Sequence, residues 1–155
     1  MGFPHDGTAA GLVSQETGDR LLSFDFPIRG EHVAIQPEVI LKRFDQPDEV
    51  RQMAKGRFEL VRIGGMTIGR ATYEPGWRWS EHVGPSVGQT RCSVEHVGLV
   101  IAGTATAAFG DGRVIELRAG ELFYIPPEPH DSWVVGDVPY VSLHLLGADH
   151  YARRD

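Results

Sequence analysis

Short apolar runs separated by glycine- and proline-rich turns are the feature that most constrains this chain. The 155 residues include 19 glycines and 10 prolines, and from Phe58 onward they interrupt runs rich in Val, Ile, Tyr, Phe and Thr. β-Branched and aromatic residues favour strands, and Gly and Pro mark turns, so the pattern predicts an all-β sandwich or barrel. The expected strands are residues 58–63, 66–73, 77–82, 91–102, 104–109, 113–117, 121–125, 130–135 and 140–146.

One short helix is predicted over residues 45–56. Polar residues stand at its N-cap position, Pro47 lies in the first turn, and Gly56 provides a left-handed stop. We expect Val50 and Met53 to face inward and the helix to cover one end of the barrel.

The chain divides into an irregular N-terminal arm, residues 1–30, one barrel domain, residues 31–150, and a polar tail, residues 151–155. Its length suits one domain with a sizeable core. Two weaker strand candidates, residues 21–26 and 32–35, are expected to add to a sheet edge.

Charge and cysteine content exclude several classes of partner. The net charge of −6 argues against nucleic acid, because phosphate binding needs a basic face. The longest apolar run, residues 97–102, is too short to cross a bilayer, and the N-terminus lacks the pattern of a signal peptide. Cys92 is the only cysteine, which excludes an intramolecular disulfide. We therefore expect a cytoplasmic protein without a membrane partner.

Three histidines fall within the expected strands: His82, His96 and His130. Successive strand residues point to opposite faces, so we place His96 inward, with open space beside it at Gly98. The tryptophans then fall on the outer faces: Trp77, Trp79 and Trp133. An outer patch of three tryptophans is typical of an interface, which predicts a homodimer.

The spacing around these histidines resembles the first motif of the cupins. That motif is a glycine, five residues, His-x-His, a short gap, Glu, six residues and Gly. Here Gly76 is followed by five residues and His82, and His96 is followed by six residues and Gly103. Gly84 stands where the motif has its second histidine, and His96 stands at the position of the glutamate.

The second cupin motif is a glycine, five residues, and Pro-x-Gly-x-x-His. Gly120 is followed by five residues and Pro126, and His130 comes soon after, one residue early. The chain thus resembles a small single-domain cupin over residues 66–147. The resemblance implies a cupin-type double-stranded β-barrel, or jelly roll.

The resemblance also implies a metal centre on His82, His96 and His130. Three imidazoles with an open position suit catalytic zinc, and imidazole also suits iron and nickel. We expect a divalent transition metal, zinc or iron first, with nickel and manganese as alternatives. With no carboxylate ligand, the ion keeps its full charge and binds an anionic ligand or a water of lowered pKa.

Three further residues bear on this centre. A one-residue bulge would turn Glu95 inward in place of His96. We expect His144 to be a core or surface histidine, with a fourth ligand or a base as the alternative. Cys92 shares a face with His96, but four residues of extended strand separate the two by about 13 Å, so we expect Cys92 to be a core residue.

The expected function is binding of, or action on, a small molecule at the metal, with an anionic molecule as one option. Cupins of this size include dioxygenases and isomerases, so the resemblance implies a broad class of enzyme, and no catalytic residue is assigned. The alternative is a non-catalytic module that binds or senses a ligand. A deep pocket beside the metal would favour the enzyme, and a closed site would favour the module.

Overall fold

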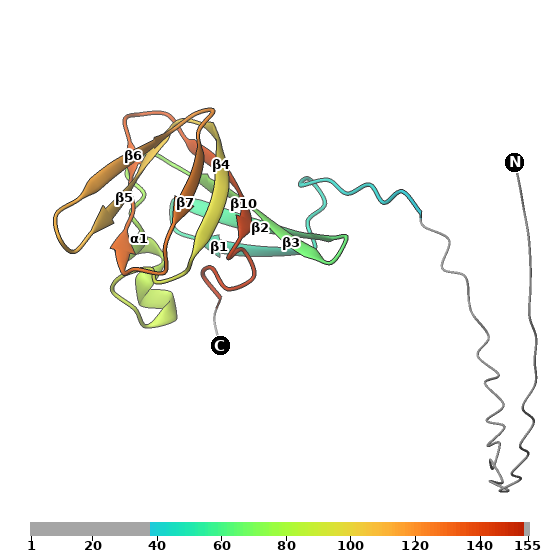
Figure 1. The fold of residues 1–155 in the computed structure, drawn as a ribbon, viewed down its shortest axis with the longest axis horizontal. Helices are drawn as coiled ribbons and strands as arrows, with labels where there is room; N and C mark the ends of the chain where they lie inside the picture. Colours follow the sequence, from blue (N-terminus) through green and yellow to red (C-terminus); the bar gives the residue numbers. More distant parts are fainter. Residues whose placement is uncertain (1–37, 154–155) are drawn as a thin grey trace, which may run out of the picture. The chain divides into compact units, whose positions relative to one another are not determined.

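The structure, a computed structural model, describes residues 38–153 and consists mainly of antiparallel strands (Figure 1). The strands are β1 (Glu49–Met53), β2 (Gly56–Ile63), β3 (Met66–Tyr73), β4 (His96–Ala102), β5 (Thr104–Phe109), β6 (Val114–Arg118), β7 (Leu122–Ile125), β8 (His130–Asp131), β9 (Val134–Val135) and β10 (Tyr140–Leu146). Two short helical segments, α1 (Trp79–His82) and η1 (Gly84–Val87), lie between β3 and β4.

The strands form two sheets. One has six strands in the order β1-β2-β3-β10-β4-β7, and the other contains β6, β5 and β8, with β9 also paired to β5. Figure 1 shows β5 and β6 on one side of the barrel and β4, β7 and β10 on the other. Inward side chains of both sheets meet in one apolar core. The expected all-β fold is confirmed.

The β2–β3 hairpin shows how local sequence builds this core. Gly64 and Gly65 have φ values of 57° and 78°, which suit the two-residue turns preferred in hairpins. The turn sets the register, and alternation along β2 then directs Phe58 and Leu60 inward, where both are fully buried.

The predicted helix over residues 45–56 is wrong. Residues Glu49–Met53 form β1 and pair with β2, and burial alternates from one residue of β1 to the next. Lys55 lies in the connecting turn with a left-handed φ of 58°. Proline and polar residues precede turns and strands as well as helices, and the backbone pairing offered by β2 decides between these outcomes here.

The predicted outward orientation of the tryptophans is also wrong for two of them. Trp77 is 1% exposed and Trp79 is 3% exposed. The Trp77 ring stacks on Tyr73 with 3.8 Å between centroids. Trp133 is half-buried, with the Arg78 guanidinium 4.5 Å from the centre of its ring. The expected strand over 77–82 becomes α1 from Trp79, so its side chains do not alternate. The homodimer stays a prediction without this support.

At the C-terminal end, the barrel domain extends beyond the expected boundary at residue 150. Tyr151, which the sequence assigns to the tail, is buried in the core, and Tyr73 donates a hydrogen bond of 2.8 Å to its hydroxyl. The strand candidates at 21–26 and 32–35 lie outside the described residues, so the N-terminal boundary stays a prediction. No helix among residues 38–153 is long and apolar enough to span a membrane.

Candidate metal centre

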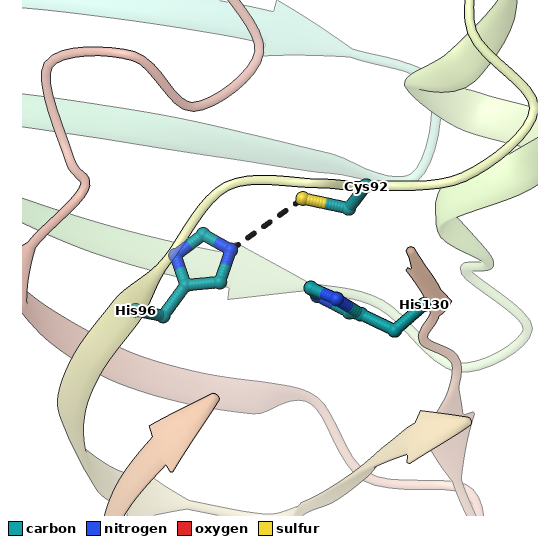
Figure 2. Close-up of side chains that lie close together, drawn as sticks. All are labelled: Cys92, His96 and His130. Atoms are coloured by element: carbon teal, nitrogen blue, oxygen red, sulfur yellow. Dashed lines mark hydrogen bonds between the residues drawn. The ribbon is translucent and has the colours of Figure 1, made fainter. Parts of the chain in front are cut away.

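Three buried side chains converge inside the barrel: Cys92, His96 and His130 (Figure 2). One potential ligand atom of each lies within 4.8 Å of the other two. The residues are only 2%, 3% and 3% exposed, in that order. Cys92 Sγ lies 3.5 Å from His96 Nε2. Donors on one tetrahedral zinc ion lie about 3.5 Å apart, so the three atoms are placed for a shared ion with small adjustments.

Backbone pairing positions two of the three side chains. Cys92 and His130 form an antiparallel bridge in which each N–H donates to the other's carbonyl at 2.9 Å. Directly opposed residues of such a pair project to the same face, so both side chains enter the barrel together. His96 is the first residue of β4 and pairs with Ile125 of β7, which directs its ring inward as predicted.

The predicted separation of Cys92 from His96 is wrong. It assumed a continuous strand over residues 91–102, whereas residues 93–95 belong to no strand and β4 begins at His96. The intervening chain bends and brings the thiol beside the imidazole. The sequence offered one signal for this, because the continuous apolar run starts only at Val97.

His82 does not join the cluster. It is half-buried at the end of α1, and its Nδ1 lies 2.9 Å from the Arg78 carbonyl oxygen. α1 forms here because the Asp131 carboxylate accepts hydrogen bonds from the Ser80 N–H and hydroxyl, both at 3.0 Å, which satisfies the first turn of the helix. The structure therefore brings together two of the three predicted histidines and places Cys92 where the third was expected.

The two alternative ligands lie outside the group. The Glu95 carboxylate accepts a hydrogen bond of 2.9 Å from the exposed hydroxyl of Tyr124, so it faces away from the cluster. His144 is buried in β10, with its ring centroid 5.3 Å from that of His96 and its Nε2 3.1 Å from the Ser142 hydroxyl. It packs beside His96 as a neighbour of the cluster.

The space next to the cluster is a small aromatic cavity of about 40 Å³. Six aromatic side chains help to line it: Tyr73, Trp77, Trp79, Phe123, Tyr140 and Tyr151. A water molecule needs about 10–15 Å³ of such space, so the cavity accepts a few waters or one very small molecule. The open space predicted beside Gly98 is absent, since a Cβ there would lie 2.4 Å from the Phe123 ring.

Burial keeps the cluster uncharged at neutral pH. Desolvation, followed by the neighbouring His144 and His130, lowers the pKa of His96 to about 2. Desolvation also lowers the pKa of His130, although the nearby Glu128 carbonyl opposes the shift. It raises the pKa of the Cys92 thiol to about 11. The cluster without an ion therefore consists of two neutral imidazoles and a protonated thiol, and a bound cation would displace the thiol proton.

The hydrogen bond of the His130 imidazole fits metal binding. His130 Nδ1 lies 2.7 Å from the Glu128 carbonyl oxygen, which only accepts, so Nδ1 carries the proton and Nε2 keeps a free lone pair. His96 Nδ1 is buried and has no hydrogen-bond partner among residues 38–153. An ion bound at Nε2 would not give this atom a partner. The suitability of the site for a thiophilic cation rests on the donor types, one cysteine sulfur and two imidazole nitrogens.

No protein-family model and no curated protein matches the sequence. Solved structures with similar folds include a protein with a double-stranded beta-helix domain from Klebsiella pneumoniae, at 18% identity and a TM-score of 0.46 over 72% of this chain and 91% of that one. Another is a cupin 2 domain-containing protein from Halorhodospira halophila, at 22% identity and a TM-score of 0.46 over 62% and 66%. A third, from Rhizobium leguminosarum and of unknown function, has 20% identity and a TM-score of 0.45 over 60% and 81%.

These similarities carry no argument about substrate or reaction, so the chemistry of the cluster rests on the residues of this chain. The described residues form two antiparallel sheets around one core, and a buried Cys-His-His cluster lies between them.

Proposed function

We propose that this protein binds one divalent transition-metal ion through Cys92 Sγ, His96 Nε2 and His130 Nε2. The convergence of three buried donors, two of them neutral imidazoles, carries the proposal. Zinc is the first choice among the predicted metals, because cysteine sulfur and histidine nitrogen are its usual ligands. Iron and nickel follow, and the thiolate disfavours manganese, which prefers oxygen ligands.

The donor set revises the charge expected at the centre. Cys92 would bind as a thiolate, so the centre would carry a single positive charge in place of two. The ion would supply a Lewis acid with a fourth position open to a water-sized ligand. The Glu128 carbonyl orients the His130 ring through its Nδ1–H, and the aromatic lining keeps bulk water away from the donors.

The size of the cavity favours a metal-binding module that holds or senses a very small ligand. About 40 Å³ does not enclose an organic substrate together with an ion. A metal-dependent enzyme of the dioxygenase or isomerase type is the second candidate, and the three-donor set favours it because a fourth position stays open. The small-molecule partner and the cytoplasmic location remain predictions.

Metal content of matched variants tests the proposal. The protein would be purified without a histidine tag, and bound metal would be measured for the wild type and for His96→Gln, His130→Gln, Cys92→Ser and His82→Gln. We expect about one ion per chain in the wild type and in His82→Gln, and loss of the ion in the two other histidine variants. A cobalt-loaded sample should show a thiolate-to-metal absorption band that Cys92→Ser removes.

Two results would contradict this assignment. Full metal content in both His96→Gln and His130→Gln would remove the centre altogether. Loss of metal in His82→Gln, with full content in Cys92→Ser, would restore the three-histidine centre predicted from the sequence.

A further inference from the structure

The three donor residues are almost fully buried, so a reagent or ligand larger than water gains full access to them when part of the barrel moves. The adjoining cavity holds little more than water. The strands around the cluster are held in sheets by backbone pairing. The segment Gly147–Arg153, here named the closing segment, follows β10 and belongs to no strand (Figure 1).

The closing segment covers the cluster through Tyr151. The Tyr151 ring is buried, with its centroid 5.5 Å from that of His96, and its hydroxyl accepts a hydrogen bond from Tyr73. At the start of the segment, Gly147 lies so close to the chain before His96 that a Cβ would be 2.0 Å from the Glu95 carbonyl oxygen. The segment thus begins beside the residue that precedes His96, and its Tyr151 ring packs against the His96 ring.

The same segment separates the cluster from the surface. On its inner side, Tyr151 lines the small cavity that also contacts the three donor residues. On its outer side, Asp149, Ala152 and Arg153 line a surface groove of about 690 Å³ along β1. Ala152 has a left-handed φ of 52°, a backbone conformation that L-residues adopt at a cost in energy. Displacement of this segment would join the groove to the cavity.

Besides Tyr73, the Arg51 side chain ties the closing segment to the sheet. Arg51 of β1 donates hydrogen bonds to the carbonyl oxygens of Ala148, at 3.3 Å, of Asp149, at 3.1 Å, and of Tyr151. Its side chain is 12% exposed, and its Nε donates to the Glu49 carboxylate at 2.7 Å. The backbone hydrogen bonds of the segment to Gly147 are local, so they move with the segment.

We propose that the closing segment opens to admit ions or ligands to the Cys92, His96 and His130 cluster, and that Arg51 holds it shut. Arg51 is therefore a positioning residue for access. That the opening admits an ion rests on the proposed metal binding. The opening of the segment itself is measurable in metal-free protein.

The single cysteine reports the opening directly. In metal-free protein, the rate at which a thiol reagent such as dithionitrobenzoate modifies Cys92 measures how often the cluster is exposed. We expect Arg51→Met, which keeps the aliphatic stem, to raise this rate at least tenfold. A tenfold change equals about 1.4 kcal/mol, close to the lower limit for a hydrogen bond to a charged group.

Arg62→Met is the matched control. Arg62 pairs with the same Glu49 carboxylate, at 2.6 Å, and lines the same groove, but makes no hydrogen bond to the closing segment. In Arg62→Met, the rate at which Cys92 is modified should stay within twofold of the wild-type rate. Tyr73→Phe, which removes the hydroxyl that bonds to Tyr151 and keeps the ring, should raise the rate in the same direction as Arg51→Met.

Dependence on denaturant separates opening of the segment from unfolding of the whole barrel. Local opening exposes little surface, so the rate in Arg51→Met should change little at low urea concentration. A rate equal to that of Arg62→Met, or one that rises with the full urea slope of global unfolding, would overturn the proposal. Because the assay uses metal-free protein, failure of metal binding and failure of the closing segment give different results.

Discussion

Acidification should destabilise the metal-free protein because its buried histidines resist protonation. Burial lowers the pKa of His96 to about 2 and that of His144 to about 4, whereas an unfolded histidine has a pKa of about 6.5. Between these values the unfolded chain binds protons that the folded chain excludes. The stability contributed by the neutral histidines is therefore complete above pH 6.5 and is lost as the pH falls toward the folded pKa values.

The size of the effect follows from the two pKa differences. At pH 5.0 each of the two histidines costs about 2 kcal/mol relative to pH 7.5, so together they remove about 4 kcal/mol. The pKa of His130 is lowered as well, which acts in the same direction. Since a typical domain has only about 5–15 kcal/mol of stability, the loss should be large enough to measure easily.

Urea unfolding followed by tryptophan fluorescence, with a chelator present, measures the difference between pH 7.5 and pH 5.0. His144→Gln, whose amide retains a partner for the Ser142 hydroxyl, should reduce that difference by about 2 kcal/mol. The exposed His150 provides the control, since His150→Gln should leave the difference unchanged. Equal stability at the two pH values, or a full difference in His144→Gln, would refute the reasoning.

Three further predictions concern the packing of the barrel and are tested by urea unfolding. Gly98→Ala should lower the free energy of unfolding by about 3 kcal/mol or more, because the new methyl group would overlap the Phe123 ring and a backbone carbonyl of β10. An unchanged urea midpoint would show that the surrounding residues shift to accommodate the methyl group. Asp131→Ala should cost about 1–3 kcal/mol through the polar groups of α1 that it leaves without a partner, whereas no loss would mean that water replaces the carboxylate. Leu60→Ala should cost about 2–5 kcal/mol, against about 0.5 kcal/mol or less for Leu122→Ala, whose side chain is 73% exposed; similar costs would contradict the assignment of the core.

Strands bounded by glycine turns could be predicted almost to the residue. The predicted ranges 66–73, 104–109 and 140–146 are those of β3, β5 and β10. Turn residues act locally, because a glycine with positive φ ends one strand and sets where the next begins. The inward orientation of His96 and His130 was predictable for the same reason, since each stands in or at the start of a strand.

Contacts between distant residues decided what could not be predicted. The polar and proline residues before β1 suit a helix or a strand equally, and only the position of β2 selects the strand. His82 is carried away from the cluster because Asp131, far along the chain, completes the first turn of α1. Cys92 joins the cluster because its backbone pairs with that of His130. None of these partners is visible from local pattern.

That reciprocal bridge between Cys92 and His130 has an evolutionary consequence. The main chain, and not the side chains, determines where these two positions meet. A single codon change at position 92 or 130 therefore exchanges one donor for another on an unchanged scaffold. Substitution at either position would thus change the hardness of the proposed donor set while the backbone geometry stays the same.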